Sequence, residues 1–321
     1  MGDVITSAQY AQILTHSALR EETNRFAETP YLLVDHSALA VEPVVMPMLP
    51  VIGVKGQSEH PAIDVFATDD AQLNTLKHAI QRSPDTAATL VQLLRHNANA
   101  NIIDGLFAES LAYSTLQQST VFQAWLTDEA KPTSQSDQLA PVLVERIEDQ
   151  LHITLNRPKV HNAYSTSMRD HLVQALYLAD ADPTIQAVKI AGNGPSFCAG
   201  GDLTEFGRVT DAAQAHLSRT TRSAGAVLSA LACQTTVRVH GACIGAGIEV
   251  PAFAKHIAAT EDAFFQLPEV SFGLVPGAGG TVSITKRIGR HRTAWLALSN
   301  ARLSAHQALA WGLIDSIVDT T

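Results

Sequence analysis

The sequence predicts an α/β protein in two parts, and three observations support this prediction. In residues 142–321, patterns typical of strands alternate with patterns typical of helices. In residues 1–127, helical patterns dominate, and the few apolar runs that resemble strands are short. Between the two parts lies "DEAKPTSQSDQLAP", residues 128–141, which is polar, contains two prolines and lacks hydrophobic periodicity. Such a composition is typical of a linker.

The N-terminal part is expected to begin with a helix and to pass through short strands into further helices. Prolines and a glycine separate the apolar runs that predict the strands. Asp69 or Asp70 can cap the second helix, and Pro84 suits the first turn of the third. The expected helices cover residues 7–27, 69–83, 84–96 and 102–126, and the expected strands cover 31–35, 50–54 and 62–68.

The C-terminal part is expected to open with a β-hairpin, residues 142–155, that turns at 148–150. Strands, glycine-rich turns and helices then follow one another to the end of the sequence. Expected helices are 165–180, 211–232, a short one from Gly247, 279–288, 291–298 and 304–311; expected strands are 186–192, 235–241, 256–260, 263–267 and 313–318.

Composition limits the classes of function. With 46% hydrophobic and 17% charged residues, the chain of 321 residues has the composition of a folded globular protein. A net charge of −9 argues against a partner bound through nucleic-acid phosphates. No proline-free apolar run is long enough to span a bilayer, and the first residues do not resemble a secretion signal. The three cysteines form no C-x-x-C pair, and His240, His256 and His291 show no H-x-H or H-E-x-x-H metal-ligand spacing. We therefore expect a soluble, cytoplasmic protein with no metal, nucleic-acid or membrane partner.

Two segments share one plan, in which an apolar strand leads through a glycine-rich turn into a helix. They are "VKIAGNGPSFCAGGDL", with its turn at Ala199–Gly201, and "VRVHGACIGAGIEV", with its turn at Gly245–Gly247. Each turn exposes unpaired backbone N–H groups at the start of a helix. A single such turn is often explained by packing alone. Two that converge can place two donors on one carbonyl oxygen and stabilise an enolate or oxyanion.

Five motifs in residues 142–318 resemble the enoyl-CoA hydratase/isomerase (crotonase) superfamily. They are "LNRPKVHNAYS", "SFCAGGDL", "HGACIGAGIEV", "LPEVSFGLVPGAGGT" and "LSAHQALAWGLIDSIV", and they occur in the family's order and spacing. The resemblance implies a spiral of ββα units, preceded here by the mainly helical N-terminal part. It also implies an acyl-CoA thioester as substrate with no separate cofactor, and assembly as a homotrimer or a dimer of trimers.

By the same resemblance, the backbone N–H groups of Gly201 and Ala246 are the oxyanion donors. Many relatives have glycine in place of Ala246, so alanine fits only if the backbone there does not need a positive φ. The residues expected to bind the CoA moiety are Lys159, Ala163, Ala199, Gly201, Asp202 and Leu203. Among these, Ala199 is expected beside the adenine and Lys159 near the phosphates.

Glu249 and Glu269 match the two catalytic glutamates of the family's hydratases. Taken alone, a carboxylate at a helix start interacts favourably with the helix dipole, and a glutamate after a strand often faces solvent. Taken together, two carboxyl groups can hold one water: one accepts its proton as the oxygen attacks C3, and the other delivers a proton to C2. The sequence thus favours hydration of a 2-enoyl-CoA, a hydro-lyase reaction. An isomerase, a hydrolase, a cofactor-independent oxygenase or a non-catalytic acyl-CoA-binding subunit remain alternatives.

Several other residues have more than one interpretation. Glu109 falls on the apolar stripe of the helix at 102–126 and is expected to be buried and hydrogen-bonded, or at its edge, rather than catalytic. Tyr164 can narrow the acyl pocket, offer a hydroxyl or only pack. Cys198 is expected to be structural. The basic run 286–292 is expected on a solvated helix face, with binding of CoA phosphates as the alternative.

Most relatives continue after the segment matching "GLIDSIV" with a helical tail that seals the acyl pocket and the trimer contact, and this sequence does not. We expect helices within 69–127 to take over that role, because the core face under the tail would otherwise expose apolar surface.

Overall fold

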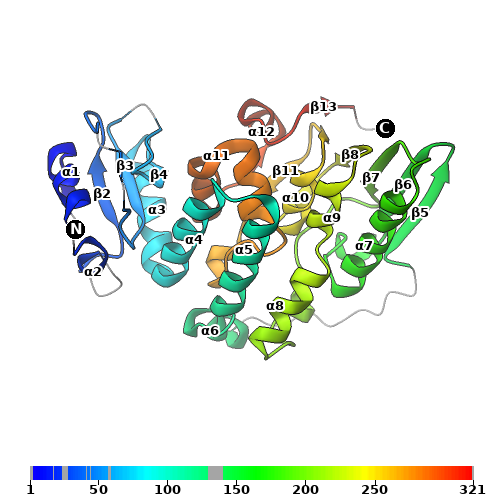
Figure 1. The fold of residues 1–321 in the computed structure, drawn as a ribbon, viewed down its shortest axis with the longest axis horizontal. Coiled ribbons are helices and arrows are strands. Elements are labelled where there is room, and N and C mark those ends of the chain that lie inside the picture. The colour runs from blue at the N-terminus through cyan, green and yellow to red at the C-terminus, as the bar shows by residue number, and fades with distance from the viewer. Residues whose placement is uncertain are drawn as a thin grey trace.

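A computed structural model describes residues 3–16, 18–23, 28–40, 42–43, 45–56, 59–128 and 140–319 (Figure 1). Of the expected linker 128–141, residues 129–139 lie outside the described residues. Within the described residues, no helix is both long and apolar enough to cross a membrane.

The chain begins with a small parallel sheet of four strands in the order β1-β2-β3-β4. A capping box between Thr6 and Gln9 starts the first helix, which ends at Thr15, so the expected helix 7–27 is wrong in its length. Tyr10 is fully buried in a small hydrophobic cluster with Val34 and Val51 of the sheet, and it donates a hydrogen bond to the carbonyl of Ala62 (2.8 Å). The elements are β1 (Val4–Ile5), α1 (Ser7–Thr15), α2 (Leu19–Glu22), β2 (Leu32–Asp35), β3 (Val51–Val54) and β4 (Val65–Phe66).

Four helices follow; polar side chains cap three of them, and the fourth, α4, begins at Pro84, as expected. The Asp69 carboxylate accepts from the N–H of Gln72 (2.8 Å), and the Asn101 side chain accepts from that of Asp104 (2.9 Å). The expected helix 102–126 is broken, because the Ser119 hydroxyl caps a new helix by accepting from the N–H of Phe122 (3.2 Å). The helices are α3 (Asp70–Arg82), α4 (Pro84–Asn97), α5 (Ile102–Leu116) and α6 (Thr120–Asp128).

The C-terminal part contains a six-stranded sheet in the order β13-β10-β8-β7-β6-β5. Only the β5–β6 pair is antiparallel, and it is the expected hairpin. A second sheet has three strands in the order β12-β11-β9. The strands are β5 (Val142–Ile147), β6 (Gln150–Leu155), β7 (Ala187–Gly192), β8 (Gln234–Val239), β9 (Ala242–Ile244), β10 (His256–Thr260), β11 (Phe264–Gln266), β12 (Leu303–Ser304) and β13 (Ser316–Val318).

The helices of this part follow the expected order, with one difference. The expected helix 211–232 is two helices, because the Ser223 hydroxyl caps the second by accepting from the N–H of Ala226 (3.2 Å). The break expected between the helices 279–288 and 291–298 is present as a kink at Gly289 (φ 79°), although both stretches carry the single label α11. The helices of the C-terminal part are α7 (Thr166–Ala181), α8 (Ala212–Thr221), α9 (Ala224–Ala230), α10 (Ala246–Glu249), α11 (Gly280–Ser299) and α12 (Ala305–Trp311). Short 3₁₀ turns lie at Pro158–Val160, Leu203–Glu205, Pro251–Phe253 and Glu269–Phe272.

Helices α4 and α5 pack against α11, so the N-terminal part and the C-terminal sheet share one hydrophobic core (Figure 1). The buried side chains of Asn97 and Thr281 are hydrogen-bonded across this contact (2.9 Å). The basic run 286–292 lies here as well. Arg290 binds Asp64 (3.2 Å), and His291 contacts the carbonyl of Ile63 (3.0 Å). The expectation of a solvated face is therefore wrong for Arg290 and His291, which the N-terminal part covers, whereas Lys286 and Arg292 are exposed as expected.

Candidate active site

The two glycine-rich turns meet. Cys198 and Cys243 form a parallel bridge, in which the N–H of Ile244 donates to the carbonyl of Cys198 (3.0 Å). The approach is so close that a β-carbon on Gly247 would lie 2.1 Å from the Cys198 oxygen. Only glycine fits at that position. Strands β7 and β8 are neighbours in the sheet, which explains why the turns that follow them lie side by side.

Gly201 and Ala246, one from each turn, line a cavity of about 320 Å³. The bridge between Tyr164 and Gly201 uses the N–H groups of Tyr164 and Asp202, and leaves that of Gly201 unused. Ala246 is the first residue of α10, so its N–H has no acceptor within the helix. The positive φ of this turn falls on Gly245 (φ 49°) and not on Ala246, so alanine is unstrained there.

Glu249, at the end of α10, lines the same cavity and is 2% exposed. One of its oxygens, Oε2, accepts from the N–H groups of Ala278 (2.7 Å) and Gly280 (2.9 Å), at the N-terminus of α11. Burial raises the pKa of Glu249 to about 7, although these N–H bonds act to lower it.

Glu269 approaches the cavity from the 3₁₀ turn that follows β11. A β-carbon on Gly245 would lie 2.4 Å from Oε1 of Glu269 and 3.6 Å from Oε1 of Glu249, so the two carboxyl groups flank one backbone atom. Oε2 of Glu269 is buried and has no hydrogen-bond partner. Burial, and then the charge of Glu249, raise the pKa of Glu269 well above its usual value.

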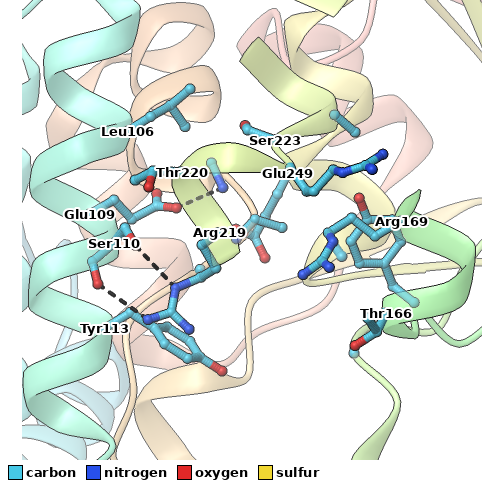
Figure 2. Close-up of a pocket in the computed structure, with 18 of the residues that line it drawn as sticks. Leu106, Glu109, Ser110, Tyr113, Thr166, Arg169, Arg219, Thr220, Ser223 and Glu249 are labelled. Atoms are coloured by element: carbon cyan, nitrogen blue, oxygen red, sulfur yellow. Dashed lines mark hydrogen bonds between the residues drawn. The ribbon is translucent and has the colours of Figure 1, made fainter. Parts of the chain in front are cut away.

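A third carboxyl group, that of Glu109, comes from α5 in the N-terminal part (Figure 2). Its Oε1 accepts from the N–H of Gly279 (2.7 Å), and its Oε2 from the N–H (2.9 Å) and hydroxyl (2.6 Å) of Thr281. Burial and the charge of Glu249 raise its pKa to about 8. The prediction of a buried, hydrogen-bonded residue is confirmed. Its place beside the two expected catalytic glutamates could not be predicted, because no local pattern relates α5 to α11.

The residues expected to bind CoA occupy two adjoining segments, 157–164 and 199–203. The N–H of Ala199 donates to the carbonyl of His161 (2.9 Å), and Arg157 joins the Ala163 carbonyl (2.6 Å) to the Asp202 carboxylate (2.9 Å). Of the six residues, Gly201 and Asp202 line the cavity; Lys159, Ala163, Ala199 and Leu203 do not. Lys159 is exposed beyond it.

Two ambiguous residues now have a definite place. Tyr164 lines the cavity and also packs against the core, so it narrows the pocket and fills space at once. Cys198 is 1% exposed, and burial raises the pKa of its thiol to about 12, so it lacks the character of a nucleophile. This agrees with the expected structural role.

Sequence reasoning missed the polar side chains on the other walls. Tyr113 and Ser110 come from α5, Arg169 from α7 and Arg219 from α8 (Figure 2). Lone arginines on helices carry no sequence signal for a site. The packing of α5 on α8, and of both α5 and α7 on α9, brings these four side chains around one space.

Comparison with known proteins agrees with this geometry. Residues 147–321, more than half of the chain, match the family model for enoyl-CoA hydratase/isomerase. The chain belongs to the enoyl-CoA hydratase/isomerase family. A curated relative in this family, the 2,3-dehydroadipyl-CoA hydratase of Escherichia coli (strain K12), is 34% identical over 179 residues, which are 56% of this chain and 69% of the relative. The trans-2-decenoyl-[acyl-carrier-protein] isomerase of Streptococcus mutans is 30% identical, over 52% of this chain and 65% of its own length.

Solved structures of the family have the same fold. The enoyl-CoA hydratase from Thermoplasma volcanium matches with a TM-score of 0.53 and 33% identity, over 57% of this chain and 73% of that one. This confirms the expected crotonase fold. The chain spans between 63% and 69% of the length of four curated hydratase relatives.

Proposed function

We propose that this chain is an enoyl-CoA hydratase, which adds water across the 2,3-double bond of a 2-enoyl-CoA thioester. One observation carries the proposal: both glycine-rich turns and both carboxyl groups, Glu249 and Glu269, line a single cavity. The N–H groups of Gly201 and Ala246 would donate to the thioester oxygen. Negative charge develops on this oxygen when a nucleophile attacks C3, and each such donor is worth roughly 3 kcal/mol in the transition state.

The surroundings of the two carboxyl groups support different roles for them. Glu249 accepts two backbone hydrogen bonds, which favour its ionised form, so it is the proposed base. Glu269 is buried without such partners on Oε2 and next to the Glu249 charge, which favours its protonated form. In the proposed step, Glu249 takes a proton from water as the oxygen bonds to C3. The π electrons move onto the thioester oxygen as an enolate, and Glu269 returns a proton to C2 as the carbonyl re-forms.

The remaining expectations belong to this proposal. The CoA moiety would lie along Lys159, Ala163, Ala199 and Leu203, beyond the cavity mouth at Gly201 and Asp202. No cofactor is needed, because the substrate carries its own CoA. A trimeric or hexameric assembly and a cytoplasmic location accompany the proposal as family expectations.

The decisive experiment follows the loss of absorbance of the conjugated enoyl thioester. Wild type should hydrate a 2-enoyl-CoA, and Glu249→Gln and Glu269→Gln should each lower kcat by about a hundredfold or more. Both variants keep the shape of the side chain, so binding of a saturated acyl-CoA should persist. Unchanged activity in both variants would contradict the two-carboxylate mechanism.

Double-bond isomerisation is the second candidate, since the Streptococcus mutans relative is named an isomerase. Product analysis separates the two reactions, because hydration adds a hydroxyl group and isomerisation leaves the mass unchanged. Binding of thioesters without any turnover would instead indicate a non-catalytic acyl-CoA-binding subunit.

A further inference from the structure

Three arginines line the cavity that also holds the glutamates, in a chain whose net charge is −9. Arg169 lies in the first turn of α7, Arg219 near the end of α8, and Arg222 directly after α8. Figure 2 shows Arg219 beside Ser110 and Tyr113 of α5, with Arg169 across the cavity. The oxyanion donors and the two glutamates account for the reacting carbons of the proposed substrate, and they leave these cations without a role.

Arg219 is held in place by neutral groups. Its Nε donates to the hydroxyl of Ser110 (3.2 Å), its Nη2 donates to the Ser110 carbonyl (3.3 Å) and to the Ser114 hydroxyl, and its guanidinium lies 4.6 Å from the centre of the Tyr113 ring. The contact from Nη1 to Gln117 is long, at 3.5 Å, so this end of the guanidinium keeps donor capacity.

The described residues give Arg219 no carboxylate at salt-bridge distance. Four other arginines with little exposed side chain each have a carboxylate partner. Arg95 and Arg290 bind Asp64, Arg157 binds Asp202, and Arg287 binds Asp315. Glu109 is the carboxyl group whose charge acts to raise the pKa of Arg219. Both of its oxygens already accept hydrogen bonds, from the N–H groups of Gly279 and Thr281. A largely buried cation without a counter-ion is costly, and burial accordingly lowers the pKa of Arg219.

The two neighbouring arginines differ in how far their charge is compensated. Arg169 is paired with Asp170 on its own helix (2.9 Å). Arg222 is half-buried at the cavity wall, and no partner for its guanidinium is seen among the described residues. The uncompensated positive charge therefore gathers at Arg219 and Arg222, where α8 meets α9.

We propose that the acyl group bound in this cavity carries a carboxylate at its far end, and that Arg219 binds this carboxylate with Arg222 beside it. A guanidinium matches a carboxylate with two parallel hydrogen bonds, and such a pair restores the missing counter-charge. The substrate class is then an ω-carboxy-2-enoyl-CoA. This inference rests on the proposed function, because it names the acyl group of the same substrate.

Binding tests the inference without depending on turnover. Calorimetry compares saturated acyl-CoAs with and without a terminal carboxylate, matched at each length of a chain-length series. Wild type should bind the carboxylate at least about tenfold more tightly at its best length. Arg219→Gln should abolish this preference, and Arg219→Lys should keep part of it. The matched control is Arg146→Gln on exposed β5, which should leave the preference unchanged.

The alternative is that Arg219 only ties α8 to α5. In that case Arg219→Gln weakens both ligands equally, and the inference is overturned. Equal binding of the two ligands by wild type overturns it as well, even if Arg219→Gln does not fold. Arg222→Gln, at the more exposed position, should lower the preference without loss of folding.

Turnover separates this inference from the proposed function. If wild type hydrates charged and neutral 2-enoyl-CoAs with equal kcat/KM, the carboxylate inference fails and hydration stands. If it prefers the carboxylate in binding but hydrates neither compound, hydration fails and the anionic acyl group stands.

Discussion

Glu109 and Glu249 accept hydrogen bonds from alternate backbone N–H groups of one turn. Glu249 takes those of Ala278 and Gly280, and Glu109 takes those of Gly279 and Thr281. Together the two carboxyl groups occupy successive donors at the N-terminus of α11, where the helix dipole favours negative charge. A helix from the N-terminal part thereby fixes the loop that orients the proposed catalytic base.

The first prediction concerns Glu109→Gln. The amide nitrogen of glutamine cannot accept a hydrogen bond, so one backbone N–H of the turn loses its partner. We expect the free energy of unfolding to fall by roughly 1–3 kcal/mol and kcat to fall more than KM changes. Urea unfolding and steady-state kinetics measure both effects. The control is the exposed Glu145→Gln on β5, and a Glu109→Gln enzyme as stable and active as that control contradicts the role.

A second prediction is the pH dependence of activity. Burial raises the pKa of Glu249 to about 7, and a base must be ionised to accept a proton. The value of kcat/KM should therefore rise as the pH increases through about 7. A profile that is flat between pH 5 and 8 would exclude Glu249 as the base.

The raised pKa of Glu249 also affects how the free energy of unfolding depends on pH. Unfolded chains release the proton of a glutamate near its usual pKa of about 4.3, while native Glu249 keeps it up to about 7. The native state binds more protons in this window, so its stability should decrease as the pH rises. Unfolding measured across the window should show a weaker decrease in Glu249→Gln than in wild type.

A third prediction concerns the contact between the glycine turns. In Gly247→Ala the new methyl group meets the backbone oxygen of Cys198, which cannot move without shifting the Gly201 turn. We expect kcat/KM to fall about a hundredfold, because small displacements of positioned groups are that costly. Ala246→Gly is the paired variant and should stay active, since the positive φ belongs to Gly245. An active Gly247→Ala together with an inactive Ala246→Gly would contradict the proposal that Ala246 and Gly201 form one oxyanion site.

A fourth prediction concerns the ion cluster between the N-terminal part and α11. Asp64 is 1% exposed and binds Arg95 (2.8 Å) and Arg290 (3.2 Å). Asp64→Asn leaves two largely buried guanidinium groups without a counter-ion, so the free energy of unfolding should fall by roughly 3–5 kcal/mol. Chemical denaturation tests this against Asp149→Asn, in the exposed hairpin turn. A loss no larger than that of the control would show that the cluster does not stabilise the fold.

A fifth prediction concerns the cover that the N-terminal helices provide. A chain beginning at Pro141 loses α4 and α5, which exposes the apolar face of α11 and opens the cavity wall at Glu109 and Tyr113. We expect it to aggregate and to lack activity, as measured by light scattering and the enoyl absorbance assay. A soluble, assembled and active product would refute the covering role.

The sequence by itself determined the fold of the C-terminal part and which residues its turns present. Strand alternation, capping residues and the two glycine turns are local patterns, and they correctly located the hairpin 142–155, α7, β7 and the turns at Gly201 and Ala246. The helix 102–126 was expected to be unbroken, because its helical pattern continues through Ser119. The expectation failed there, because the Ser119 hydroxyl caps a new helix by accepting from the N–H of Phe122.

Only the tertiary structure decided what surrounds those turns. Glu109 and Arg219 are far from Glu249 in the chain, and they enter one cavity because α5 packs against both α8 and α11. Apolar spacing can show that a helix has a buried face, but the hydrophobic effect is non-directional, so the spacing does not show which helices that face packs against. Local motifs therefore determine the residues of the two turns, and the packing of distant helices determines which side chains surround them.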